Sequence, residues 1–146
     1  MTAPLQTSRY GIETTTRAGY DETVARVRDA LKEEGFGVLT EIDVQRTLKE
    51  KLGKDVRPYV ILGACNPPLA HRALGAEPDI GLLLPCNVVV REEADGRLVV
   101  GFMDPVAVLQ MTSNAEVAAV AHEVHRRLQR VKALLSVPKG GDPAAL

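Results

Sequence analysis

The fold is decided by one stretch, Val88-Val89-Val90-Arg91-Glu92-Glu93-Ala94-Asp95-Gly96-Arg97-Leu98-Val99-Val100. Its middle, Ala94-Asp95-Gly96, is a tight-turn sequence between two runs rich in β-branched residues, a pattern typical of an antiparallel hairpin. We predict one strand over 80–91 and the next over 97–103. The other elements are placed around this hairpin.

The N-terminal part predicts a strand and then a helix. Residues 8–16 are rich in β-forming residues and predict a strand. Asp21 and Glu22 then stand in the first turn of a predicted helix, which Gly35 ends. Apolar residues recur along this helix at the spacing of one buried face: Tyr20, Val24, Val27 and Leu31.

Two further strands are predicted before the hairpin, each followed by a short helix. Phe36, Val38 and Thr40 alternate as a strand, and Asp43 is a good N-cap for a helix that Gly53 closes. Residues 57–65 form the next strand, apolar on both faces from position 59 to 64. Asn66-Pro67-Pro68 opens another short helix, ended by Gly75.

The C-terminal part predicts the longest helix. Ser113 with Glu116 fits a capping box, and Asp104-Pro105 starts a brief helical turn upstream. The apolar positions at helical spacing are Val117, Val120, Ala121, Val124, Leu128, Val131 and Leu135. Basic residues gather in its second half: Arg126, Arg127, Arg130 and Lys132. They suit either a basic binding patch or, the interpretation we favour, a solvated face whose charge matches the helix dipole.

The order of elements predicts the fold class. Without the short helices it is β-α-β(4)-α, an α+β domain with a mainly antiparallel sheet and two long helices on one face. Residues 1–137 form one domain in this interpretation. The stretch 138–146 has turn-forming residues and little to bury, so we predict a disordered C-terminal tail.

Composition narrows the possible partners. The chain has 146 residues and a net charge of -1, and with 3% aromatic residues it offers no base-stacking platform. We therefore expect no nucleic acid partner. No signal peptide and no apolar run long enough to span a membrane is visible, which predicts a cytoplasmic protein without a membrane partner. Cysteines stay reduced in that compartment.

Two cysteine–asparagine steps, Cys65-Asn66 and Cys86-Asn87, hold the only cysteines of the chain. With Pro68 as the first residue of its helix, Cys65 ends a strand just before free helix N–H groups and the positive end of the helix dipole. That environment stabilises a thiolate. Side chains lean toward the N-terminus of a helix, so the ring of His71 is expected to reach the region of Cys65.

Cys86 shares a strand face with Leu84 and Val88, and the neighbouring Pro85 indicates a sheet edge or a bulge. Three interpretations of the thiols stay open: packed cysteines beside a surface histidine, a disulfide, or a working thiol or metal site made of Cys65, His71 and Cys86. In the last, Cys65 is the nucleophile or soft ligand, His71 the base or second ligand, and Cys86 the resolving thiol or third ligand.

Three further side chains are candidates for ligand binding. Asn66 and Asn87 can each present an amide, and a carboxylate such as Asp104 could complete a metal site. Each also has a structural interpretation: a cap or turn for Asn66, a bulge for Asn87 and a helix cap for Asp104. His122 and His125 lack the spacing of a zinc-protease helix and receive little weight.

Several segments together resemble a prokaryotic family catalogued as domain of unknown function 302. They are Gly35-Phe36-Gly37-Val38-Leu39-Thr40-Glu41-Ile42-Asp43, Gly63-Ala64-Cys65-Asn66-Pro67-Pro68, Leu83-Leu84-Pro85-Cys86-Asn87-Val88 and Met103-Asp104-Pro105. The resemblance covers about residues 8–136 and implies a homodimeric domain with an architecture like that of the TATA-binding protein. It implies neither DNA binding nor any assigned activity or cofactor.

The sequence thus predicts a cytoplasmic homodimer whose Cys/His cleft binds a small ligand or metal ion, or performs thiol chemistry. The alternative is a non-enzymatic homodimeric interaction protein with structural cysteines. Neither the ligand nor a reaction follows from the sequence.

Overall fold

Antiparallel pairing joins five strands into one sheet in the order β1-β5-β4-β3-β2. The computed structural model describes residues 8–136. The strands are β1 (Gly11–Thr16), β2 (Gly37–Asp43), β3 (Tyr59–Cys65), β4 (Cys86–Glu92) and β5 (Leu98–Met103). The helices are α1 (Tyr20–Glu33), α2 (Val44–Leu52), α3 (Pro67–Ala76), α4 (Pro105–Leu109) and α5 (Ala115–Leu135), with a 3-10 turn η1 (Pro78–Leu83). The predicted α+β class is confirmed.

The β4–β5 hairpin forms as predicted. Gly96 has φ +84°, a left-handed conformation that glycine adopts without strain. The Glu93 N–H donates to the Arg97 carbonyl at 2.8 Å and closes the turn. Val90 lies opposite Val100 in the resulting register.

Several predicted boundaries differ from the structure. The strand predicted over 80–91 starts at Cys86, because Pro78–Leu83 forms η1 and Pro85, after a cis peptide bond, has no N–H to donate to a ladder. Pro85 marks neither an edge nor a bulge of β4, which lies between β5 and β3; the irregularity is in β2, between Val38 and Thr40. The N-cap of α5 is Asn114 instead of Ser113.

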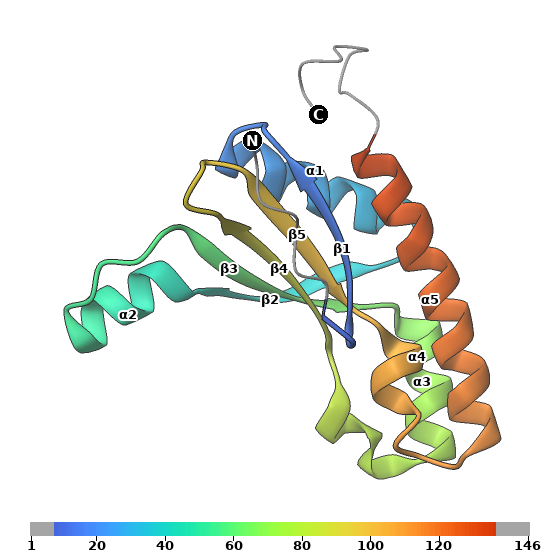
Figure 1. Cartoon of the computed structure of the whole chain (residues 1–146). Coiled ribbons are helices and arrows are strands. Elements are labelled where there is room, and N and C mark those ends of the chain that lie inside the picture. The colour runs from blue at the N-terminus through green and yellow to red at the C-terminus, as the bar shows by residue number, and fades with distance from the viewer. Residues whose placement is uncertain (1–7, 137–146) are drawn as a thin grey trace.

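The covered face of the sheet carries the core. Strand alternation puts Leu62, Val88 and Phe102 on this face, and each is at most 1% exposed. Helices α1 and α5 pack over it together, as predicted (Figure 1). All seven apolar positions predicted for α5 are buried, so the helix presents the expected face to the sheet.

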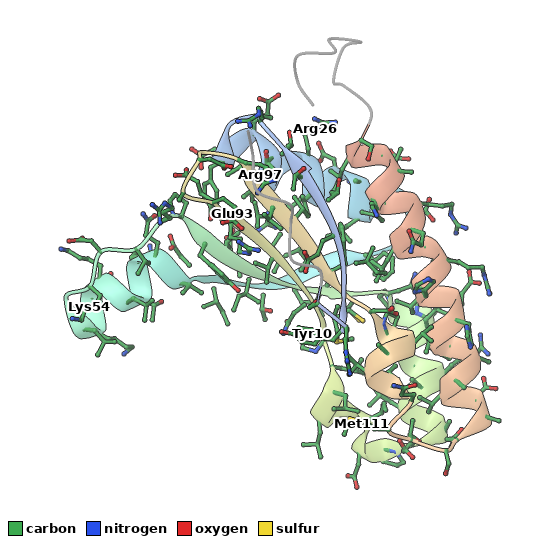
Figure 2. All side chains as sticks on the ribbon, viewed as in Figure 1. Tyr10, Arg26, Lys54, Glu93, Arg97 and Met111 are labelled. Atoms are coloured by element: carbon green, nitrogen blue, oxygen red, sulfur yellow. The ribbon has the colours of Figure 1, made fainter. Side chains whose placement is uncertain are left out.

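The open face of the same sheet has no second layer among residues 8–136. It carries Glu13, Ile61, Val89, Arg91, Val99 and Gly101, which alternate with the covered positions. Val99 is only 2% exposed, so part of this face is buried by neighbouring side chains. Helix α2 covers little of the molecule, because none of its residues is buried and it extends beyond the ends of β2 and β3 (Figure 1). The exposed Lys54 follows the far end of this helix (Figure 2). The predicted tail, 138–146, lies outside the described residues.

Candidate functional site

A pocket of about 280 Å³ lies where the covered face meets α3, α4 and α5. Strands β3 and β4 supply Ala64, Cys65 and Cys86, and η1 with the segment after it supplies Gly81, Leu84 and Pro85. The helices close the other side with apolar groups, which are Leu69, Ala70, Ala73, Leu74, Pro105, Leu109, Val120 and Val124. Figure 1 shows these three helices gathered at one end of the sheet.

The described side chains that line this pocket carry no charge. The polar groups among them are the thiols of Cys65 and Cys86 and the amide of Asn66. Burial, and secondarily the nearby Cys65, raises the pKa of the Cys86 thiol to about 11, so this thiol is neutral at physiological pH. The pocket is therefore an uncharged, mainly apolar environment.

The start of α3 has no free N–H group to offer a thiolate, which corrects the sequence expectation. The first helical residue is Pro67, not Pro68, so the first two helical positions both lack an N–H. The next N–H, of Leu69, donates to Asn66 Oδ1 at 3.2 Å, and that of Ala70 donates to the Asn66 carbonyl at 2.9 Å. Asn66 thus acts as a helix cap, its structural interpretation.

The two cysteines border one pocket but leave the sheet on opposite sides. Cys86 lies opposite Ala64 and is 8% exposed, on the covered face. Strand alternation assigns Cys65, the next residue after Ala64, to the other face, where it is half-buried at the end of β3. Both thiols are free.

The structure does not bring His71 to this pocket. The residue is exposed on α3, whose buried positions are Leu69 and Ala73, and it is not part of the pocket wall. Among residues 8–136, no group of three or more His, Cys, Asp or Glu side chains is placed to hold a metal ion. The three-residue site of the sequence analysis is thus divided between the pocket and the surface.

Asn87 and Asp104 also lie apart from the pocket. Asn87 pairs regularly with Gly63 and lines the open face, so the bulge interpreted for it does not form. Asp104 accepts a hydrogen bond from the Val106 N–H at 3.0 Å and caps α4. The same carboxylate oxygen is 3.0 Å from Nδ1 of His125, so Asp104 also ties α4 to α5.

The basic half of α5 is held in ion pairs. Glu123 binds both Arg126 and Arg127, and these hydrogen bonds lower the pKa of its carboxyl group. Arg130 binds Glu34 at 2.8 Å, which connects α5 to the end of α1. These contacts suit the solvated-face interpretation of the cluster.

No helix within the described part of the chain is long and apolar enough to cross a membrane.

Sequence reasoning missed the side of the pocket made by α4 and α5. Pro105, Leu109, Val120 and Val124 each follow an ordinary core pattern, and no local signal separates pocket-lining residues from close-packed ones. The available signal was the alternation of small and large residues in α3, where Ala70 and Ala73 leave room beside Leu69 and Leu74.

Comparisons with known proteins agree with this architecture. Residues 12–135 match the family described as "Domain of unknown function DUF302". The crystal structure of an uncharacterized conserved DUF302 protein from Bacillus stearothermophilus superposes with a TM-score of 0.80 and 33% identity. The match covers 87% of this chain and 98% of that one. No curated protein sequence matches this chain.

Proposed function

The chain belongs to the DUF302 family, and on this premise we propose that it binds a small, uncharged, mainly apolar molecule in the pocket beside α3, α4 and α5. The observation that carries the proposal is the wall of that pocket, whose described side chains are apolar apart from two thiols and one amide. Pockets of this kind are the usual sites of small-molecule binding.

Size and charge restrict the ligand. A dry cavity of about 150 Å³ in another protein accepts benzene, so a pocket of about 280 Å³ suits a molecule of roughly ten carbon atoms. An anion would leave water without gaining a cation or a free helix N–H, because Pro67 and Pro68 occupy the first turn of α3. The site therefore favours a neutral ligand.

The pocket assigns different roles to its three polar groups. Cys86 contributes a neutral thiol to the wall, as its raised pKa supports. Cys65, half-buried at the strand end, is the thiol open to reagents from solvent. The side-chain oxygen of Asn66, Oδ1, accepts the capping hydrogen bond from the Leu69 N–H. The side-chain N–H₂ group is therefore left as the donor for a ligand acceptor.

We also propose a cytoplasmic homodimer without nucleic acid as a partner. Two free thiols suit a reducing compartment. The pairing of Arg126, Arg127 and Arg130 with glutamates leaves little unpaired positive charge on α5 for a phosphate backbone. The second candidate function, a non-enzymatic interaction protein with structural cysteines, is favoured by the apolar side chains of Ile61 and Val89 on the open face of the sheet.

The test compares two ligands with the same ring system, 2-naphthol and 2-naphthoate, by thermal unfolding and isothermal titration at pH 7. The neutral naphthol is expected to bind and to raise the unfolding midpoint, since a ligand that binds only the folded state stabilises it. The naphthoate is expected to have at least tenfold weaker affinity.

Two variants test whether the ligand binds in the pocket. Ala70→Leu fills part of the pocket and is expected to weaken naphthol binding at least fivefold. Ala118→Leu makes the same change at an exposed position of α5 and should leave binding unchanged. Equal binding of both ligands, or equal effects of both variants, would contradict the proposal.

A further inference from the structure

The pocket beside α3, α4 and α5 is buried at one end and open at the other. The buried apolar residues of its wall, each at most 7% exposed, are Phe36, Ala64, Leu69, Ala73, Leu109, Val120 and Val124. Leu39 of β2 and Leu74 of α3 also line the pocket, yet they are 68% and 41% exposed. These two leucines therefore mark the open end, and they define the mouth of the pocket.

Local features of the chain place the two leucines at the mouth. In β2, Val38 lies opposite Ala64 and Thr40 opposite Gly63, so Leu39 has no partner on β3. An extra residue of this kind interrupts the strand alternation and redirects a side chain. Leu74 lies beside η1, because a Cβ at Gly81 would be 3.9 Å from Leu74 Cδ2. The mouth thus combines large apolar groups from separate elements.

The polar groups of the pocket lie at its buried end. Asn66 and Cys86 are 7% and 8% exposed. Asn66 Oδ1 accepts the hydrogen bond from the Leu69 N–H, and no group within residues 8–136 accepts one from Asn66 Nδ2. A buried donor without an acceptor carries a free-energy cost. A ligand acceptor at the buried end would remove this cost.

The wall suits an aliphatic chain with a single polar group. Asn66 Nδ2 is the one amide donor among the described wall side chains, so further polar groups on a ligand would leave water without a partner. Phe36 is the one aromatic ring among them, so most of the wall packs against methylene groups instead of ring faces. A chain of more than roughly ten carbon atoms fills the pocket and reaches the mouth.

We infer that the ligand is a neutral, single-chain aliphatic molecule with one carbonyl group, such as a long-chain ketone or ester. It binds with the carbonyl oxygen at Asn66 Nδ2 and with the end of its chain between Leu39 and Leu74. The chain end then shields these exposed leucines from water. The inference rests on the function proposed above and specifies the chemical class and the orientation of the ligand.

Isothermal titration of the full chain with 2-octanone, 2-decanone and 2-dodecanone tests the chain. Affinity is expected to rise about fourfold for each methylene group that the buried end encloses. From 2-decanone to 2-dodecanone it should still rise, by about twofold per methylene group, because the mouth buries the added groups only in part. Equal affinities of 2-decanone and 2-dodecanone would contradict a chain that reaches the mouth.

A pair of leucine variants tests the mouth. Leu39→Ser is expected to weaken the binding of 2-dodecanone about threefold and to leave that of 2-octanone unchanged, since the shorter chain ends inside the pocket. Leu52→Ser is the matched control, because Leu52 is 65% exposed on α2 and is not part of the pocket wall. It should leave the binding of both ketones unchanged.

A pair of asparagine variants tests the carbonyl site. Asn66→Asp keeps an oxygen that caps α3 but removes the donor, and it should weaken 2-octanone binding at least tenfold. Binding of 2-naphthol should weaken less, since its hydroxyl group can donate to the new carboxylate. Asn87→Asp makes the same change at an exposed position of the open face and should leave both affinities unchanged.

Circular dichroism verifies that each variant is folded. The ligand class is overturned if Leu39→Ser acts like Leu52→Ser, or if Asn66→Asp weakens 2-octanone and 2-naphthol equally. It is also overturned if 2-naphthol binds and no ketone does, and in each of these cases the proposed function stands. A chain that binds neither 2-naphthol nor any of the ketones overturns both.

Discussion

Val88 and Val89 are adjacent, identical in chemistry and part of the same strand, yet the two faces that they represent differ in almost every respect. Val88 is 0% exposed within the hydrophobic core, whereas Val89 is half-buried and lines a hollow of the open face. On the covered face, an uncharged pocket lies between the sheet and helices α3, α4 and α5. On the open face no helix packs over Ile61 and Val89 within residues 8–136, and both stay half-buried. The difference shows that the helices, rather than the strand sequence, decide which face is buried.

The largest difference in the free energy of unfolding is expected between Val88→Ala and Val89→Ala. The first substitution removes two buried methyl groups and leaves a cavity, which should lower the free energy of unfolding by about 2–3 kcal/mol. The second should cost under about 1 kcal/mol, because Val89 is only half-buried. Urea denaturation measures both. Equal losses would mean that both faces are packed within one chain.

The pH dependence of stability should reveal the environment of Cys86. Its pKa is about 11 in the folded protein, because burial penalises the thiolate, against about 9 for an ordinary thiol. Below pH 9 both states keep the proton and stability is unaffected. Between pH 9 and 11 only the unfolded state loses it, so stability should fall by about 2 kcal/mol as pH rises.

Cys86→Ala isolates this contribution. Tyr20, whose pKa burial and then the nearby Asp43 raise to about 12, also destabilises the fold at high pH, but it is present in both proteins. The difference between wild type and Cys86→Ala should therefore shrink or reverse from pH 8 to pH 11 in urea denaturation. A constant difference over this range would show that Cys86 ionises as readily in the folded state.

The smallest expected difference in the free energy of unfolding is between a substitution in the close-packed part of the covered face and one beside the pocket. Val131 and Val124 both lie on the buried side of α5, but only Val124 lines the pocket. Val131→Ala should cost about 2 kcal/mol, and Val124→Ala about 1 kcal/mol, because Val124 already has fewer neighbours to lose. If chemical denaturation gave the reverse order, the pocket would be filled by neighbouring side chains.

Local chemistry could be predicted from the sequence, and spatial relations could not. The face of α5, the caps Asp43 and Asp104, and the hairpin turn at Gly96 depend on spacing and on side chains a few residues apart, and each was predicted correctly. Asn66 was assigned a cap for the same reason. The direction of His71 depends on which side of α3 meets α5, which no local pattern contains.

The pocket is the clearest case of this limit. Its wall combines Cys86 of β4 with Leu109 of α4 and Val124 of α5, residues that are ordinary in their own segments. Helix α3 begins at Pro67, one residue before the predicted start at Pro68. The first two helical residues therefore have no N–H group, and the predicted stabilisation of a Cys65 thiolate by free N–H groups is lost. Chemistry at a helix end is sensitive to a single position.

The most direct test of the account is a methyl NMR titration with 2-naphthol at low protein concentration. Resonances of the pocket residues Leu69, Leu109 and Val124 should shift with one shared saturation curve, while those of Ile61 and Val89 on the open face stay in place. Shifts confined to Ile61 and Val89, or none at all at saturating naphthol, would contradict it.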